Sequence, residues 1–189
     1  MASASSDPRI EILAVRLITM SAALPQDPIA AAQANWEKAG WGEVAEPVAT
    51  VTSIVRANQI LTGRAEALLR PFDLTFARYE MLMVLRFARR PMAMSKASRV
   101  LQVHPTSVTA ASERLERDGL ITKTPSPDDA RTVLLAITEA GRELSEETTQ
   151  ILNRELFAQT GFTQREIATL NRILRKFRQK NGDFAEPLG

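Results

Sequence analysis

Apolar residues recur three and four positions apart along most of this 189-residue chain, and this spacing predicts a mainly helical protein. The longest stretch with this spacing covers residues 47–70, and two others cover 139–159 and 164–178. Between them lies a segment, residues 120–138, that we expect to form a β-hairpin. The pattern therefore predicts a mainly α fold with one small β-hairpin.

Two short helices joined by a tight turn are predicted immediately before this hairpin. The first should begin at Ser95, whose hydroxyl can cap free backbone N–H groups. Its expected buried residues are Ala97, Val100 and Leu101. Proline is tolerated in the first turn of a helix, so Pro105 marks the start of a second helix, which Gly119 ends. Val108, Ala111 and Leu115 should be its buried residues.

The second helix presents a polar and basic face opposite its apolar one, as in a helix-turn-helix. The strands expected after it cover Leu120–Thr124 and Thr132–Thr138, around a charged turn. A hairpin in this position makes the arrangement a winged helix.

Residues that typically begin a helix locate the other predicted helices. Asp-Pro pairs precede an apolar helix over Ile10–Ala23 and a helix from Pro28 to Gly40. Pro47 is expected to open the long helix, and Thr75 and Thr138 should cap two more. Thr163 and Glu166 form a capping box before the last helix, in which each side chain satisfies the other's backbone N–H group. Residues 1–6 and 182–189 are expected to be disordered.

Several short motifs together resemble the MarR family of transcriptional regulators. They are Thr106-Ser107-Val108-Thr109, Arg114-Leu115-Glu116, Gly119-Leu120-Ile121, Asp129-Ala130-Arg131, Ile137-Thr138-Glu139-Ala140-Gly141 and the upstream stretch Leu74–Leu82. The resemblance extends from Pro47 to Phe177 and implies a winged helix flanked by long helices that pair with a second subunit. The alternative is that the apolar stripes of these long helices form the core of a monomer.

The resemblance also divides the chain. We expect an N-terminal helical extension over residues 1–46, a MarR-type domain over 47–180 and a tail over 181–189. Within the domain, the winged helix covers residues 75–138. The dimerisation helices cover 47–70 and 139–178.

Composition removes several classes of function. The chain contains no cysteine, which excludes disulfides, thiolate metal sites and cysteine-based redox sensing. No apolar run reaches the roughly 18 residues of a membrane helix, and the first residues lack the positive flank of a signal peptide. We therefore expect a cytoplasmic protein that does not bind membranes.

Catalytic and metal-binding patterns are missing as well. His104, the only histidine, lies next to Pro105 at a helix start, which favours a structural role or a phosphate contact over metal ligation. The sequence has no Gly-rich phosphate loop and no Ser/His/Asp arrangement, and its adjacent acidic residues are typical of solvated charge. We expect no enzyme activity, no metal and no cofactor.

The net charge of +2 is unevenly distributed. Residues 1–69 contain five basic and seven acidic residues, residues 70–131 eleven and seven, and residues 132–189 eight and eight. The excess of basic residues therefore coincides with the expected winged helix. This is the electrostatic pattern of a surface that contacts phosphates, although a solvated helical surface is the alternative.

Several residues are candidates for DNA contact. A basic residue at a hairpin tip can enter a narrow minor groove, and the family's Asp-x-Arg pattern is matched by Asp129, which should orient Arg131 by a charge-assisted hydrogen bond. The resemblance implies that the helix Pro105–Asp118 lies in the major groove. The other candidates are Ser95, Lys96, His104, Pro105, Thr106, Ser107, Thr109, Ala110 and Arg114. Ala110 and Ala130 depart from the polar or basic residues that many relatives have there.

The resemblance to the MarR family implies regulation by a small aromatic or phenolic acid, bound between the winged helix and the dimerisation helices. Arg56, Arg64 and Arg78 could hold its carboxylate or phenolate, although ordinary ion pairs are the alternative. Trp36 in the extension resembles a feature of the urate-responsive subgroup. The alternative is that Trp36 and Trp41 are packing anchors.

These observations favour a ligand-responsive homodimeric repressor that binds a pseudo-palindromic operator in double-stranded DNA. Two other classes fit the same sequence. One is a winged-helix protein-interaction or enzyme-accessory dimerisation module, which predicts no salt-dependent duplex binding. The other is an activator that binds DNA without a ligand.

Overall fold

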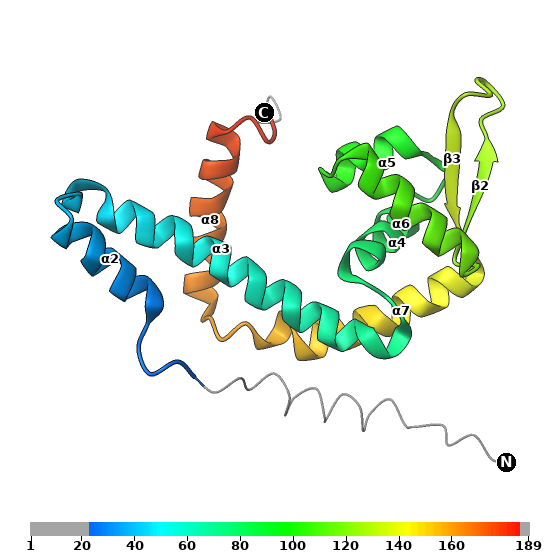
Figure 1. Ribbon diagram of the computed structural model, residues 1–189. Coiled ribbons are helices and arrows are strands. Elements are labelled where there is room, and N and C mark those ends of the chain that lie inside the picture. The colour runs from blue at the N-terminus through cyan, green and yellow to red at the C-terminus, as the bar shows by residue number, and fades with distance from the viewer. Residues whose placement is uncertain (1–22, 186–189) are drawn as a thin grey trace, which may run out of the picture. The chain divides into compact units, whose positions relative to one another are not determined.

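The computed structural model describes residues 23–185 (Figure 1). The elements, in chain order, are α2 (Pro28–Lys38), α3 (Gly42–Leu69), the 3-10 turn η1 (Arg70–Phe72), α4 (Phe76–Phe87), β1 (Met92–Ala93), α5 (Met94–Leu101), α6 (Pro105–Arg117), β2 (Ile121–Pro125), β3 (Val133–Ile137), α7 (Glu139–Glu155), the 3-10 turn η2 (Phe157–Gln159) and α8 (Gln164–Lys180). The expected mainly α fold with a small hairpin is confirmed. The helix expected over Ile10–Ala23 lies, apart from its last residue, outside the described residues. The chain forms two compact units, one ending at Leu156 and the other beginning at Phe157.

The first unit opens with α2 and α3, which form a helical hairpin (Figure 1). Asp27 caps α2 by accepting a hydrogen bond from the Ile29 N–H at 2.9 Å, as its sequence predicted. The chain then turns at Gly40, whose φ of 87° is a left-handed conformation that favours glycine. The rings of Trp36 and Trp41 meet edge to face across this turn, with centroids 5.2 Å apart.

The expectation that Pro47 opens the long helix is wrong, because α3 begins five residues earlier at Gly42. Proline inside the helix removes one backbone hydrogen bond. Packing of the first turn offsets this loss, since Ala45 is 1% exposed and the adjacent Trp41 packs on α2. The expected domain boundary between residues 46 and 47 therefore falls inside α3.

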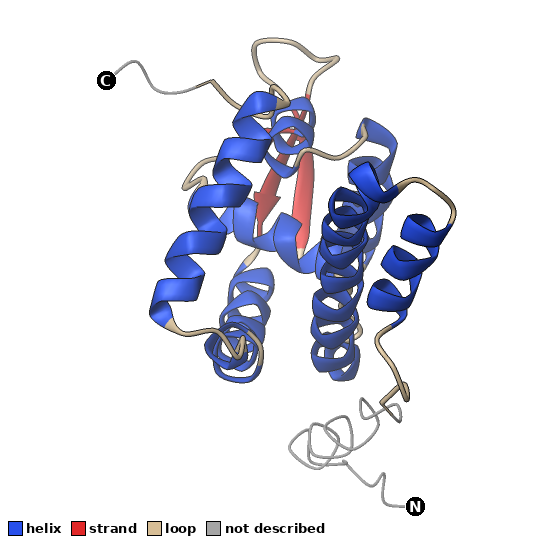
Figure 2. Ribbon diagram, turned by 90° about the vertical axis from the view of Figure 1, so that its left-hand side faces the viewer, coloured by secondary structure: helices blue, strands red, loops and turns tan. Residues whose placement is uncertain are grey.

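The helices and strands of the winged helix share one hydrophobic core. The strands lie between the helices (Figure 2). Thr75 caps α4 as expected, because its hydroxyl accepts a hydrogen bond from the Arg78 N–H at 3.3 Å. Tyr79, Leu82 and Leu85 of α4 are buried, which was also predicted. Fully buried leucines join the elements of this core: Leu69, Leu82, Leu115, Leu135 and Leu152.

The sheet has three antiparallel strands in the order β1-β3-β2. The two expected strands are confirmed within one residue at each end, with Lys123 of β2 opposite Leu135 of β3. The short strand β1 was not predicted, and it places Met92 opposite Leu135 on the other edge. Two residues are too few to produce a recognisable alternation of polar and apolar positions.

Thr138 begins α7 with two hydrogen bonds. Its hydroxyl donates to the Gly119 carbonyl at 2.8 Å and accepts from the Gly141 N–H at 3.1 Å, which confirms the expected cap. The helix ends at Glu155, four residues before the predicted end, because the chain tightens into η2. Thr138 therefore ties the start of α7 to the turn that follows α6.

Much of α3 leaves large apolar side chains uncovered. Val51, Val55 and Leu61 are 61%, 52% and 46% exposed, although their spacing predicted an apolar stripe. Ala65, Leu68 and Leu69 at the other end of the helix are buried in the core. Within residues 23–185, the stripe therefore lies only partly in the hydrophobic core.

The second unit consists of η2, α8 and the residues that follow. The capping box of α8 is present: the Thr163 N–H donates to Glu166 Oε2 at 2.8 Å, and the Thr163 hydroxyl accepts from the Glu166 N–H. The expectation of disorder is wrong for residues 182–185, because Asp183 pairs with Arg178 and Phe184 lies against the Arg175 and Arg178 guanidinium groups. No residue of α8 is buried, and its stripe of large apolar side chains is exposed.

Candidate nucleic-acid interface

The helix-turn-helix is formed by α5 and α6. The turn passes through Gln102, whose φ of 54° is left-handed, and the Ser98 hydroxyl closes it by donating to the Val103 carbonyl at 2.7 Å. Ser95 does not cap α5, which corrects the expectation: the helix starts one residue earlier, after Ala93. Val100, expected to be buried, is 53% exposed.

His104 has a structural role at the start of α6. Its Nδ1 atom accepts a hydrogen bond from the Thr106 N–H at 3.3 Å and lies 3.0 Å from the Thr106 hydroxyl. The imidazole therefore replaces the usual Ser or Asp side chain as the helix cap. Pro105 follows as the first helical residue, as its sequence predicted.

The two faces of α6 differ sharply. Val108 and Leu115 are completely buried, as predicted, and so is Ser112, whose hydroxyl donates to the Thr109 carbonyl at 2.9 Å. Ala111 is only partly buried. Residues on the opposite face are exposed: Thr106, Ser107, Ala110, Glu113 and Arg117. The helix thus presents short polar side chains at its N-terminal end and charged ones farther along.

Arg114 links α6 to the neighbouring elements through ion pairs. Its Nη2 atom lies 2.7 Å from Asp73 Oδ2 in the turn before α4, and its Nε atom lies 3.0 Å from Asp118 Oδ2. Arg78 of α4 contacts the same Asp118 oxygen at 3.3 Å. Hydrogen bonding by Asp73, with the nearby charge of Asp118, raises the pKa of the Arg114 guanidinium. A phosphate contact by Arg114 would compete with these two carboxylates.

The turn of the wing is held by Asp129. Its carboxylate accepts hydrogen bonds from the Arg131 backbone N–H at 3.0 Å and from the Thr132 hydroxyl at 2.9 Å. The expected bond to Arg131 therefore reaches its backbone, and the structure records no bond to its guanidinium within residues 23–185. Asp129 shapes the turn and leaves the Arg131 side chain exposed.

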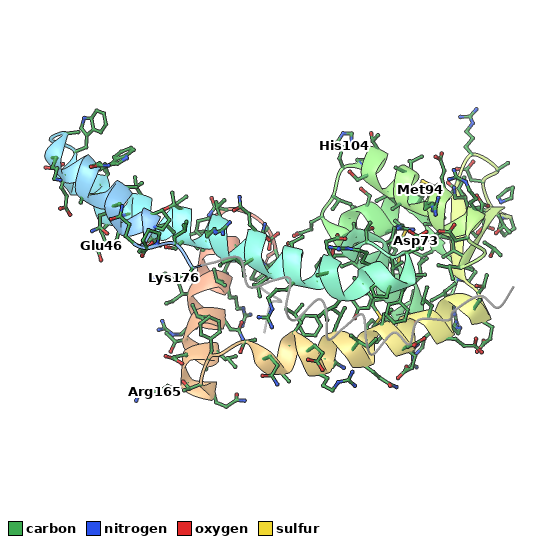
Figure 3. The ribbon with its side chains drawn as sticks, turned by 60° about the horizontal axis from the view of Figure 1, so that its bottom comes forward. Glu46, Asp73, Met94, His104, Arg165 and Lys176 are labelled. Carbon is green, nitrogen blue, oxygen red and sulfur yellow. The ribbon has the colours of Figure 1, made fainter. Side chains whose placement is uncertain are left out.

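A cleft of about 690 Å³ separates the wing from α5 and the start of α6. It brings together three of the expected residues, Ser95, Pro105 and Arg131, with Met94 and Arg99. Arg99 was not predicted from the sequence, although it lies one helical turn after the candidate Ser95 and could have been found from that spacing. Two arginines thus line a cleft between the elements expected to enter adjacent grooves. Figure 3 labels Met94, which lines this cleft, and also His104 and Asp73, which lie outside its lining.

Each residue expected to bind a ligand contacts a different neighbour. Trp36 packs on Trp41, and Arg56 donates to the Gln59 side chain at 3.3 Å. Arg64 donates to the Glu155 carbonyl of α7 at 3.0 Å. Arg78 is connected to the end of α6 through Asp118.

Two other kinds of site do not fit the described residues. None of the helices within residues 23–185 has the length and apolar character needed to cross a membrane. In the same part of the chain, no three His, Cys, Asp or Glu residues are grouped so that they could hold a metal ion. The described residues instead bring the exposed polar face of α6 beside a wing with an exposed arginine.

Comparison with known proteins gives consistent matches. The model of the MarR family matches residues 74–133, which include α4, α5, α6 and the wing turn. The transcriptional repressor IacR of Pseudomonas putida is 31% identical over 123 residues, which are 64% of this chain and 72% of that protein.

Solved structures agree with these matches. A MarR family transcriptional regulator from Streptomyces coelicolor has a TM-score of 0.68 and 42% identity, over 75% of this chain and 99% of the other. A variant of MarR from Escherichia coli, solved in complex with operator DNA, has a TM-score of 0.66 and 27% identity, over 71% and 96% of the two chains.

Proposed function

This chain belongs to the MarR family of transcriptional regulators, and on that premise we propose that it is a cytoplasmic homodimeric repressor that binds an operator in duplex DNA. The observation that carries the proposal is the exposed polar face of α6 beside the cleft lined by Arg99 and Arg131. The repressor IacR and the operator complex of the Escherichia coli relative support this role.

In the proposed complex, α6 enters the major groove. Thr106 and Ser107 project from its first turn, where free backbone N–H groups and the helix dipole favour a phosphate. Ser95 and Lys96 of α5 contact the backbone, as in other helix-turn-helix proteins whose first helix crosses it. Ala110 offers only a methyl group, which suits contact with a thymine methyl.

The wing supplies the second contact. Arg131 enters the minor groove, where the negative potential is strongest when the groove is narrow. Arg99 lies on the opposite side of the same cleft and adds a phosphate contact. Together these contacts fix the orientation of α6 on the duplex.

Two subunits are needed for operator selectivity. The exposed apolar side chains of α3 and α8 form the dimer interface, because apolar surface of this extent is stabilised when another subunit covers it. Two copies of α6 then read two half-sites about one helical turn apart, or a multiple of that distance.

Selection from a genomic library tests the proposal. The purified dimer is mixed with fragmented genomic DNA, and the bound fragments are sequenced. We expect the enriched fragments to share an inverted repeat and the dimer to bind it more tightly than a scrambled duplex of equal length. Equal binding of both duplexes would favour non-specific association, and no salt-dependent binding of either would favour the protein-interaction module.

A small aromatic acid is the proposed effector. A carboxylate bound to Arg78 would compete with Asp118 for this guanidinium, and Asp118 also pairs with Arg114 of α6. Such a ligand would bind the DNA-free form of the protein more tightly than the DNA-bound form. An effector shifts the equilibrium between two forms only through such a difference in affinity.

Titration of the protein–operator complex with salicylate tests the effector. We expect release of DNA that is weakened in Arg78→Ala, Arg64→Ala or Arg56→Ala. Release unchanged in all three variants would place the ligand elsewhere, with the Trp36 region the next to test. No release by any ligand would favour the ligand-independent activator.

A further inference from the structure

The C-terminal helix α8 carries an unusual concentration of positive charge. Residues 132–189 contain equal numbers of basic and acidic residues, but the two signs lie on different helices. α7 contains five glutamates and two arginines, whereas α8 contains six Lys or Arg residues and one glutamate. Figure 3 labels two of these cations, Arg165 near the start of α8 and Lys176 in its second half.

These cations are available to an external anion. All six are exposed, and within residues 23–185 an ion pair is recorded for Arg178 alone, with Asp183. A shallow hollow of about 350 Å³ lies on the same face of the helix. It is lined by Asn171, Arg172, Arg175, Lys176 and Gln179.

The cationic and apolar faces of α8 point in opposite directions. With about 100° of rotation per residue, Arg165, Arg175 and Lys176 lie within about 60° of Arg172. Leu170 and Leu174 lie about 160° away from it on either side. A partner that covers the apolar stripe therefore leaves the cationic face exposed.

This geometry distinguishes among polyanions. A helix that binds a lipid surface buries its apolar face in that surface, and α8 would then point its central cations away from the lipid. Single-stranded nucleic acid is usually bound with aromatic side chains that stack on its bases. Two rings lie near the ends of this face: Phe184 lies against the guanidinium groups of Arg175 and Arg178, and Phe162 lines a separate hollow with Arg165. The hollow at Arg172, Arg175 and Lys176 has no aromatic residue in its lining.

A duplex backbone fits the face better. It needs no apolar or aromatic contact, and it presents a phosphate charge for every 1.7 Å or so of its axis. The cations from Arg165 to Lys176 extend over about 16 Å of helix, so several can meet phosphates at once.

We propose that the cationic face of α8 is a sequence-independent binding site for the phosphate backbone of duplex DNA. It acts in addition to operator reading by α6 and does not depend on it. Each phosphate that the face neutralises releases counterions and so adds to the salt dependence of binding.

The test is a triple variant, Arg172→Gln, Arg175→Gln and Lys176→Gln. Glutamine has a helix propensity close to that of Arg and Lys, so the fold should be retained, which circular dichroism checks. The matched control neutralises three exposed cations outside α8 and the winged helix: Lys38→Gln, Arg70→Gln and Arg154→Gln. Both variants change the net charge equally.

Binding of a non-operator duplex is measured by fluorescence anisotropy over a range of salt concentrations. We expect the α8 variant to bind at least tenfold more weakly at low salt. Its salt slope should fall by about one unit for each phosphate that the substituted side chains no longer neutralise. The control should resemble the parent. Equal slopes for the two triple variants would overturn the proposal.

Two further readouts separate the alternatives. The preference for operator over scrambled duplex reports on α6, and we expect it to persist in the α8 variant. Sedimentation with vesicles of phosphatidylserine and phosphatidylcholine tests a lipid surface. Loss of vesicle binding in the α8 variant with duplex binding unchanged would overturn the proposal in favour of a membrane-binding helix.

Discussion

Arg131 and Arg114 are basic residues of the same winged helix, but their surroundings give them different tasks. Arg114 is held between Asp73 and Asp118 and so positions α6 against the rest of the core. Arg131 is exposed on a turn whose backbone is fixed by Asp129. The first arginine therefore supports the recognition surface, and the second is available to DNA.

Arg131→Ala should weaken operator binding and leave the unfolding temperature unchanged. An exposed side chain at a hairpin tip contributes little to stability, whereas removing a cation that neutralises a phosphate lowers the salt slope by about one unit. Arg154→Ala, which removes an exposed cation of α7, is the control and should change neither the affinity for the operator nor the salt slope. Unchanged affinity and salt slope in the Arg131 variant would mean that the wing does not enter the groove.

Gly141→Ala should destabilise the fold. A Cβ atom at this position would overlap the carbonyl oxygen of Leu120 and lie 2.9 Å from Ile137 Cγ1. Backbone cannot move aside as a flexible side chain can, so we expect a loss of about 3 kcal/mol or more in the free energy of unfolding.

Gly63→Ala is the matched control for this change. Gly63 lies inside α3 with nothing within 4 Å of its added Cβ, and alanine in a helix interior is favoured over glycine by roughly 0.5–1 kcal/mol. Chemical denaturation measures both variants. Equal stability of Gly141→Ala and the parent would refute the close approach of α7 to the end of α6.

Single residues were predictable from sequence where the signal is local. Thr75, Thr138 and Thr163 cap helices as expected, because each hydroxyl bonds an N–H group three residues ahead. Ser95 met the same criterion and does not cap. The helix begins after Ala93 instead, because packing of the segment before α5 sets its start.

The helices and strands differ in how strongly the sequence specified them. α6 and α8 begin where their caps predicted, since proline and the capping box act within one turn. The start of α3 and the strand β1 were not predicted, because contacts with α2 and with β3 determine them. Local signals therefore located most elements, and tertiary packing set the remaining boundaries.

The capping box of α8 predicts a dependence on pH. Hydrogen bonds from the Thr163 backbone and hydroxyl lower the pKa of Glu166 from its ordinary value of 4.5. A lowered pKa in the folded state stabilises that state above pH 4.5, and this contribution is lost as the pH falls through the folded value.

Glu166→Gln measures this contribution. We expect the parent to unfold at a higher temperature than the variant near neutral pH, and the difference to shrink as the pH falls below 4.5. A difference that is the same at pH 7 and pH 3 would show that ionised Glu166 does not stabilise the cap.

Dimerisation explains why large apolar side chains are exposed within residues 23–185 of a single chain. Leu170 and Leu174 of α8 are each 38% exposed, and Phe177 is 60% exposed. We expect Leu170→Arg or Leu174→Arg to yield unfolded or aggregated protein, because a charge in the interface leaves apolar surface uncovered. A soluble folded monomer with the parent's thermal stability, seen by light scattering and calorimetry, would refute an obligate dimer.

Hydroxyl-radical footprinting of a duplex selected from the genome shows whether two copies of α6 read duplex DNA. We expect two protected half-sites related by symmetry, with centres about one helical turn or a multiple of it apart. Uniform weak protection, or a single protected segment without symmetry, would contradict it.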